Sequence, residues 1–227
     1  MFDKLFPNVP QYWPDFGQAT IDTILMTLFT MIIAGILGIL LGVILLSTNE
    51  NGLTPNRIVY VILDKIVDIG RAIPFIILLV AIIPFTRLLV GTSIGTAAVT
   101  VPIVVGTIPF FARMVQNSLM EVDSGVIEAA RAMGTSNLGI IFRVYLKEGL
   151  VPILRDLNFT TISVIGLTAM AGIVGGGGLG NMAVQYGYQR GQNDVTFFAL
   201  VLVLIFVFLT QILGNLIIRI ILHGRKA

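Results

Sequence analysis

Long apolar runs separated by polar connections fill most of the chain. A membrane-spanning helix needs about 20 mostly apolar residues, because it rises about 1.5 Å per residue through a hydrocarbon core about 30 Å thick. The pattern therefore predicts an all-α integral membrane protein with a single membrane domain at 20–222. We expect five transmembrane helices, at 20–47, 58–83, 94–116, 157–174 and 195–222.

Both ends of the chain lie outside these runs. The first segment, 1–19, combines prolines with Phe6, Tyr12, Trp13 and Phe16, and rings of this kind favour the membrane interface. An interfacial extracytoplasmic segment and a frayed terminus fit this composition equally well. The first apolar run is too long for a cleavable signal, so we expect the segment to be retained. Residues 223–227 form a short tail.

Composition narrows the possible functions. The sequence is 56% hydrophobic and 11% charged, and its net charge of +2 is spread out, which argues against nucleic-acid binding. It has no cysteine, and His223 is its single histidine. No set of residues has the spacing of a catalytic or metal site. We therefore expect no enzyme activity, no cofactor and no metal.

The distribution of Lys and Arg predicts the orientation. Basic residues accumulate on the cytoplasmic side of membrane proteins. With the N-terminus outside and the C-terminus cytoplasmic, that side holds most of them: Arg57, Arg113, Arg131, Arg143, Lys147, Arg155, Arg219, Arg225 and Lys226. The long polar loop at 117–156 is then cytoplasmic.

Three charged residues share one face of the second predicted helix. Asp64, Asp68 and Arg71 are four and three residues apart, and charges within a membrane are costly unless they are paired. One interpretation is a proton relay in a gradient-driven secondary transporter. The other is a structural ion pair between Arg71 and Asp68.

Glycines and prolines mark close packing and breaks. Gly35, Gly38 and Gly42 have the spacing that lets helix backbones approach each other in lipid. The run at 175–180 lacks the strand and the lysine of a phosphate-binding loop, so we expect a turn there. Four prolines are expected to kink or interrupt the second and third helices: Pro74, Pro84, Pro102 and Pro109.

The polar loop at 117–156 contains a helix pair. Ser124 can cap a first short helix that carries Glu128, and Gly134 can end it in a left-handed conformation. Thr135 or Ser136 can cap a second helix, which runs to about residue 148. The pattern alone fits a docking element and a solvated hairpin almost equally well.

The residues of this loop resemble a known motif. Glu128-Ala129-Ala130 followed by Gly134 is similar to the EAA loop of type I ABC importer permeases. Strings elsewhere, at 71–79, 83–87, 90–95, 112–115, 177–180 and 185–188, are similar to the permease subunit of methionine-uptake ABC transporters. The resemblance covers residues 18–222. Such permeases usually follow the loop with Leu-Pro, whereas here Lys147 follows Leu146.

The resemblance implies a fold and a set of partners. It implies the type I ABC importer permease fold, a homodimer in the cell membrane, two copies of a separate ATPase subunit and an extracytoplasmic substrate-binding lipoprotein. The cargo would be L-methionine, with D-methionine or analogues as further candidates. Coupling to the ATPase would fall to Glu128, Ala129, Ala130 and Gly134, and Met170 matches a position near the constriction of the pore.

Overall fold

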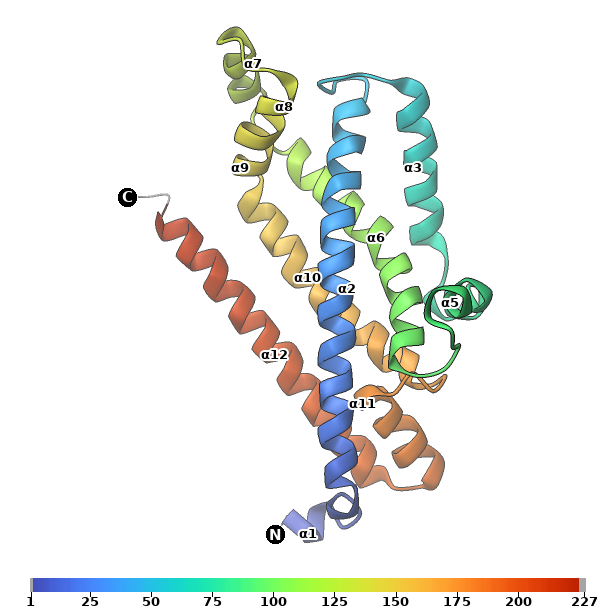
Figure 1. The fold of residues 1–227 in the computed structure, drawn as a ribbon. Helices are drawn as coiled ribbons and strands as arrows, with labels where there is room; N and C mark the ends of the chain where they lie inside the picture. The colour runs from blue at the N-terminus through green and yellow to red at the C-terminus, as the bar shows by residue number, and fades with distance from the viewer. Residues whose placement is uncertain (1, 225–227) are drawn as a thin grey trace. The chain divides into compact units, whose positions relative to one another are not determined.

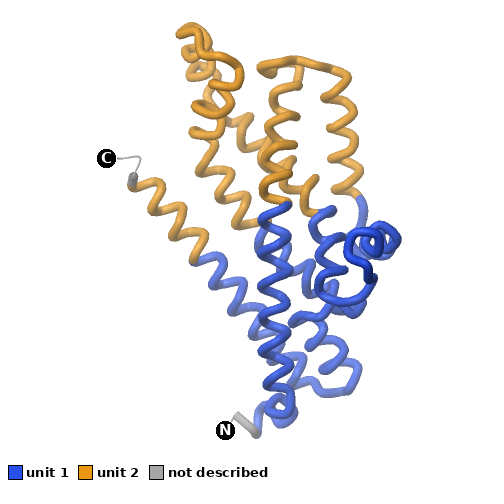
Figure 2. Tube along the Cα trace, in the orientation of Figure 1, with its two compact units in different colours: residues 1–33, 73–106, 161–212 blue, residues 34–72, 107–160, 213–227 orange. Residues whose placement is uncertain are grey.

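The computed structural model describes residues 2–224, and every regular element within that range is helical (Figure 1). These elements fall into two compact units, coloured separately in Figure 2. Unit 1 comprises residues 1–33, 73–106 and 161–212, and unit 2 comprises 34–72, 107–160 and 213–227. Arg225 and Lys226, which contributed to the predicted orientation, lie outside the described residues.

Four helices each contribute residues to both units: α2 (Trp13–Thr48), α6 (Thr96–Met120), α10 (Leu150–Gly172) and α12 (Asn193–Gly224). Unit 1 also holds α1 (Phe2–Leu5), η1 (Pro10–Tyr12), α4 (Phe75–Ala81), α5 (Ile83–Val90), α11 (Gly178–Asn181), the π-helix η3 (Met182–Gly187) and η4 (Tyr188–Arg190). Unit 2 also holds α3 (Arg57–Ala72), α7 (Ser124–Ala132), α8 (Asn137–Ile140), the π-helix η2 (Ile141–Tyr145) and α9 (Leu146–Glu148).

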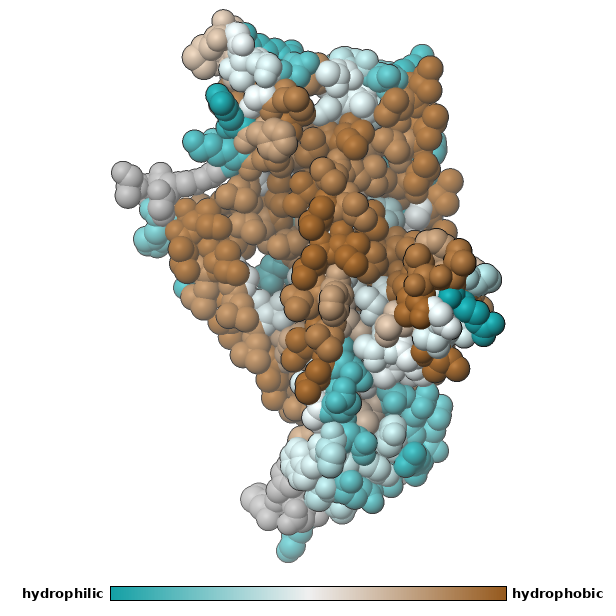
Figure 3. Space-filling view, viewed as in Figure 1, coloured by the Kyte–Doolittle hydropathy of each residue, from teal (hydrophilic) through white to brown (hydrophobic). Residues whose placement is uncertain are grey.

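Four helices in the described range are long and apolar enough to cross a membrane, within Pro10–Thr48, Thr96–Met120, Leu150–Gly172 and Asn193–His223. Hydrophobic residues cover the visible faces of α2 and α12 (Figure 3). In these two helices Ile36, Leu40, Phe208 and Ile212 are all more than half exposed. Because such a surface is unfavourable in water, its solvent is lipid.

The predicted second transmembrane helix, 58–83, is wrong as one continuous helix. The structure divides it into α3, which ends at Ala72, α4, which begins at Phe75, and the first residue of α5. Pro74 causes the first break, because it has no N–H to donate and it restricts the residue before it. Its backbone is extended, with ψ of 130°. By contrast, α6 continues through Pro102 and Pro109, so these two prolines do not interrupt it.

The glycines of α2 pack against α6 within unit 2, as predicted. A Cβ atom on Gly38 would lie 2.7 Å from the Phe111 ring, and one on Gly42 would lie 2.7 Å from the carbonyl oxygen of Ala112. Gly35 is looser, because the nearest atom to its Cβ would be in Leu157 at 3.8 Å. The two glycines that face α6 therefore allow an approach that alanine would prevent.

The N-terminal segment is folded onto unit 1. Val9 and Phe16 are buried with Leu179 and Val195. The backbone N–H and the side-chain amide of Asn8 donate to the two carboxylate oxygens of Asp194, at 2.8 and 2.9 Å. A frayed terminus is therefore the wrong alternative for these residues, and α2 starts at Trp13, before the predicted boundary at residue 20.

Candidate functional site

The residues from α7 to α9, Ser124–Glu148, form the candidate site and are called the α7–α9 segment below. Its first helix is capped by Asp123, whose carboxylate accepts a hydrogen bond from the backbone N–H of Gly125 at 2.7 Å. The prediction that Ser124 is the cap is wrong by one residue. Ser124 is already helical, whereas Asp123 has the non-helical backbone of a cap and a negative charge that suits a helix N-terminus.

Gly134 ends α7, as predicted. Its φ of +77° is a left-handed conformation that glycine adopts without strain. Its N–H donates to the carbonyl of Arg131 at 2.9 Å, and the N–H of Thr135 donates to that of Ala130 at 3.0 Å. These two bonds satisfy the last carbonyls of the helix. The predicted second helix follows as α8, η2 and α9, and Ser136 caps it by accepting from the N–H of Gly139 at 3.2 Å.

The inner face of the α7–α9 segment is buried in unit 2. Ala130, Ile140 and Tyr145 are less than a tenth exposed and pack in one cluster with residues of α2, α6 and the α2–α3 loop, including Leu46, Leu53, Phe111, Val115 and Leu119. The side-chain amide of Asn137 also donates to the carbonyl of Leu53 at 3.2 Å. The segment is therefore packed directly on helices α2 and α6.

The outer face of the same segment exposes large apolar side chains. Met133 is 79% exposed, Leu138 68% and Phe142 67%, and Val126 is also exposed. Large apolar side chains that remain exposed on a polar segment are a common feature of protein–protein contacts. The sequence reasoning missed these residues, although Leu138 and Phe142 are four apart on a predicted helix and therefore share a face.

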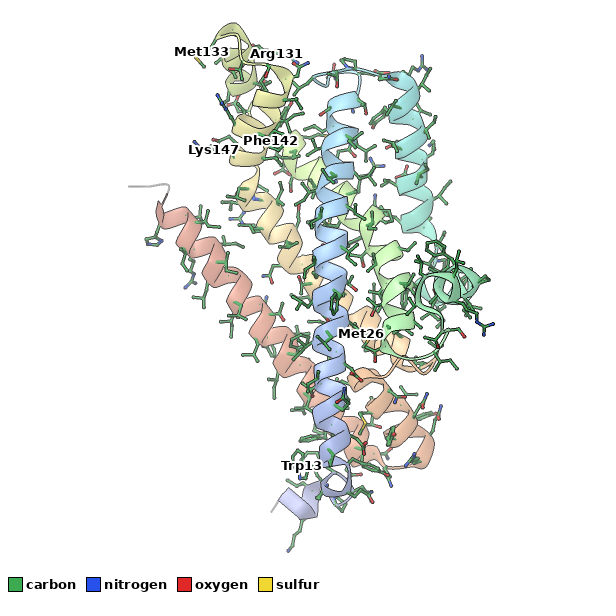
Figure 4. All side chains as sticks on the ribbon, in the orientation of Figure 1. Trp13, Met26, Arg131, Met133, Phe142 and Lys147 are labelled. Carbon is green, nitrogen blue, oxygen red and sulfur yellow. The ribbon has the colours of Figure 1, made fainter. Side chains whose placement is uncertain are left out.

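Glu128 and Arg131 lie on a different face of α7. Both line a cleft of about 290 Å³, whose other wall includes Asn49 and Asn51 of the α2–α3 loop. Figure 4 shows Arg131 directed toward that loop and Met133 on the opposite side. Burial raises the pKa of the phenol of Tyr145, which also lines this cleft, although the positive charge of Arg131 acts against the shift. The phenol therefore stays neutral at physiological pH.

The chain leaves the segment without the proline that is usual in the resembling family. After Lys147 (Figure 4), Gly149 keeps a right-handed helical backbone, and its N–H donates to the carbonyl of Tyr145 at 2.8 Å. A Cβ on Gly149 would lie 2.5 Å from a methyl of Leu119, so glycine lets the backbone approach this side chain closely. Pro152 falls in the first turn of α10, where its missing N–H costs least. The close contact between Gly149 and Leu119 therefore accompanies the entry of the chain into α10.

A second cluster of charges connects α3 to α6 within unit 2. One guanidinium nitrogen of Arg113 lies 2.6 Å from Asp64 Oδ1 and 2.9 Å from Asp68 Oδ1. Arg113 also donates to the side-chain oxygen of Gln116 at 2.8 Å, whereas Arg71 is 4.0 Å from Asp68. The structural interpretation of these carboxylates is supported, but with Arg113 as the main partner. Spacing along one helix could not reveal a partner 45 to 49 residues away.

Met170 and the glycine run belong to unit 1. Met170 lies near the C-terminal end of α10 and is 40% exposed. The glycines form the expected turn, because Gly175, Gly177 and Gly178 all have positive φ. The turn is held by the N–H of Leu179, which donates to the hydroxyl of Thr23 at 2.9 Å. No group of three or more His, Asp or Glu side chains in the described range could hold a metal ion.

Four long apolar helices, with a helix pair packed on the ends of two of them, define a multi-pass integral membrane protein. The chain belongs to the family of binding-protein-dependent transport system inner membrane components, which matches residues 38–223.

Individual relatives agree with this assignment. The chain is 44% identical over 223 residues to the methionine import system permease protein MetP of Bacillus subtilis, covering 97% of this chain and 99% of that protein. It is 44% identical over 151 residues to the D-methionine transport system permease protein MetI of Escherichia coli, covering 66% of this chain and 70% of that protein. The resemblance to methionine-uptake permeases is confirmed.

Solved structures show the same fold. A chain of the MetNI methionine ABC transporter in an inward-facing conformation superposes with a TM-score of 0.90 at 41% identity, covering 93% of this chain and 98% of that one. An amino acid ABC transporter superposes with a TM-score of 0.72 at 18% identity, which supports the fold alone. The predicted type I importer permease fold is therefore confirmed, with the broken second segment as its main difference from the predicted helices.

The structure yields a test of the charge cluster. Replacing Arg113 by Gln leaves Asp64 and Asp68 without their closest cation. We expect this change to lower the free energy of unfolding in detergent by about 2 kcal/mol, between the values typical of exposed and buried pairs. The triple variant Arg113→Gln, Asp64→Asn, Asp68→Asn should recover most of the loss. Unchanged stability of Arg113→Gln would show that the cluster does not hold α3 to α6.

Proposed function

We propose that this chain is the permease subunit of an ATP-driven importer of methionine, and that its α7–α9 segment docks on a separate ATPase. The observation that carries the proposal is the segment itself, with its inner face packed on α2 and α6 and its outer face apolar and exposed. The permease names of the relatives support the same function. The cargo is L-methionine, with D-methionine or analogues as further candidates.

The structure suggests a separate role for each of the proposed coupling residues. Ala129 and Met133 are one helical turn apart on exposed positions, so they belong to the contact with the ATPase. Ala130 is only 5% exposed, so its small side chain lets α7 pack on unit 2. Gly134 shapes the turn between the two helices, and Glu128 lines the cleft.

The transport cycle requires partners beyond the ATPase. In the proposed assembly two copies of this chain pair in the membrane, two ATPase subunits bind the α7–α9 segments, and an extracytoplasmic lipoprotein delivers the substrate. ATP binding closes the ATPase pair, and the docked segments convert that closure into a rocking of the membrane helices between inward-open and outward-open states. Met170 is the proposed gate residue, because a half-exposed thioether can close a narrow path by side-chain rotation.

A gradient-driven transporter remains the alternative function. It would use the carboxylates of α3 as a proton relay. However, Asp64 and Asp68 both form ion pairs with Arg113 of α6. This arrangement supports a structural role for the carboxylates and gives no reason to prefer proton coupling.

Charging the outer face of the α7–α9 segment should uncouple transport. We expect the double variant Met133→Asp, Phe142→Asp to insert and fold normally, because both side chains are exposed. It should lose binding of the ATPase and at least 90% of ATP-dependent methionine uptake, because the contact would have to remove two charges from water. The matched control Met133→Leu, Phe142→Leu keeps the face apolar and should retain uptake. Full uptake by the Asp variant would disprove the docking assignment.

The proposed orientation can be tested with single cysteines, because the natural chain has none. Gln189 and Asn51 are both exposed and follow the extracytoplasmic and cytoplasmic ends of predicted spans, respectively. With the N-terminus outside, a membrane-impermeant maleimide should label Gln189→Cys in intact cells and Asn51→Cys only after permeabilisation. The reverse pattern would invert the proposed topology.

A further inference from the structure

Helix α3 exposes two faces of opposite character. One is a stripe of isoleucines, spaced by three or four residues and all more than half exposed: Ile58, Ile62, Ile66 and Ile69. Such a stripe suits lipid. The other face carries Asp68 and Arg71, whose side chains are 49% and 39% exposed. Because Ile69 lies between these two residues along the helix, the charges are at the depth of the lipid-facing stripe.

The charged face is only partly satisfied by α6. A charge within a membrane faces protein or water rather than lipid. Arg113 pairs with Asp64 and Asp68 at 2.6 and 2.9 Å. By contrast, the closest approach of Arg71 to Asp68 is 4.0 Å, and Arg71 has no other polar contact among the described residues. The N–H donors of its guanidinium are therefore open to a ligand.

Asp68 also has an oxygen to offer. Both of its contacts fall on Oδ1, which lies 2.9 Å from Arg113 and 4.0 Å from Arg71. Its second oxygen, Oδ2, contacts no cation within the described part of the chain, although it can accept hydrogen bonds as well as Oδ1 does. The face therefore presents a guanidinium and a carboxylate oxygen side by side.

Water suits this face better than a second copy of the chain does. A dry protein contact would remove both charges from water, and it is stable only when the charges are closely paired and fully hydrogen-bonded. The contacts of Arg113 meet that condition, whereas 4.0 Å between Arg71 and Asp68 does not. The half-exposed pair therefore belongs beside a water-filled path.

We propose that Arg71 and Asp68 form a transient binding site for the charged head of an α-amino acid in the transport path. The inference rests on the proposed function. The planar guanidinium of Arg71 binds the α-carboxylate through two parallel N–H donors, and Oδ2 of Asp68 accepts from the α-ammonium. A zwitterion thus meets one charge of each sign. The site recognises the head common to all α-amino acids and not the methionine side chain.

Removing the guanidinium tests the site in the complete complex with ATPase and binding protein. Arg71→Gln should lower methionine uptake at least about tenfold, the effect of losing one charge-assisted hydrogen bond, while ATP hydrolysis stimulated by the loaded binding protein is retained. Arg71→Lys keeps the charge without the fork and should be intermediate. Lys65→Gln is the matched control, because it removes the same charge from an exposed position roughly 120° around α3, and it should transport normally. Normal uptake by Arg71→Gln, or loss of the stimulated hydrolysis together with uptake, would overturn the proposal.

A single cysteine beside the site tests for both water and ligand. Ala72 is exposed and adjoins Arg71 in α3. In the nucleotide-free complex of permease and ATPase, Ala72→Cys should react with a charged, water-soluble methanethiosulfonate, whereas Ile69→Cys on the isoleucine stripe should not. Near-saturating methionine should slow the reaction about tenfold, because only about a tenth of the sites stay empty. Methionine methyl ester, which lacks the carboxylate, should not slow it, and adding Arg71→Gln should abolish the protection.

Three results of this labelling would contradict the proposal: an unreactive Ala72→Cys chain, a spontaneous disulfide between two copies of it, and equal protection by the methyl ester. Failure of the proposed function would appear separately, as absence of ATP-dependent methionine uptake by the unsubstituted complex.

Discussion

The α7–α9 segment can expose an apolar outer face because its inner face is already packed. Ala130, Ile140 and Tyr145 lie in one cluster with side chains from α2 and α6, and this burial fixes a short pair of helices that would not be stable alone. Without that cluster, Met133 and Phe142 would have no fixed position to present to a partner. The buried contact therefore supports both the local fold and the proposed coupling.

Glycine allows the close contacts on which this arrangement depends. Gly42 brings α2 against α6, Gly149 brings the start of α10 against Leu119, and Gly134 turns α7 into α8. In each case the structure of the chain explains why the residue is glycine, through a close neighbour or a left-handed backbone.

The sequence predicted the features that depend on local rules. The length of the apolar runs predicted the four long helices, and the ease with which glycine adopts a left-handed backbone predicted the turn at Gly134. The interruption expected at Pro74 occurs, but 58–83 was still counted as one helix, because an apolar run does not show whether the backbone is continuous. Arg113 was missed as the partner of Asp64 because pairing between distant segments leaves no periodic signal. The family resemblance supplied the docking role, while the structure showed which side chains are free to serve it.

ATP-dependent uptake in a defined system tests the central claim most directly. Proteoliposomes that contain this chain and its ATPase, supplied with the binding protein and labelled methionine on the extracytoplasmic side, should accumulate methionine only with ATP on the side of the α7–α9 segment. Vanadate should stop this uptake and a protonophore should leave it unchanged. Uptake that persists without ATP and collapses with the proton gradient would contradict the account.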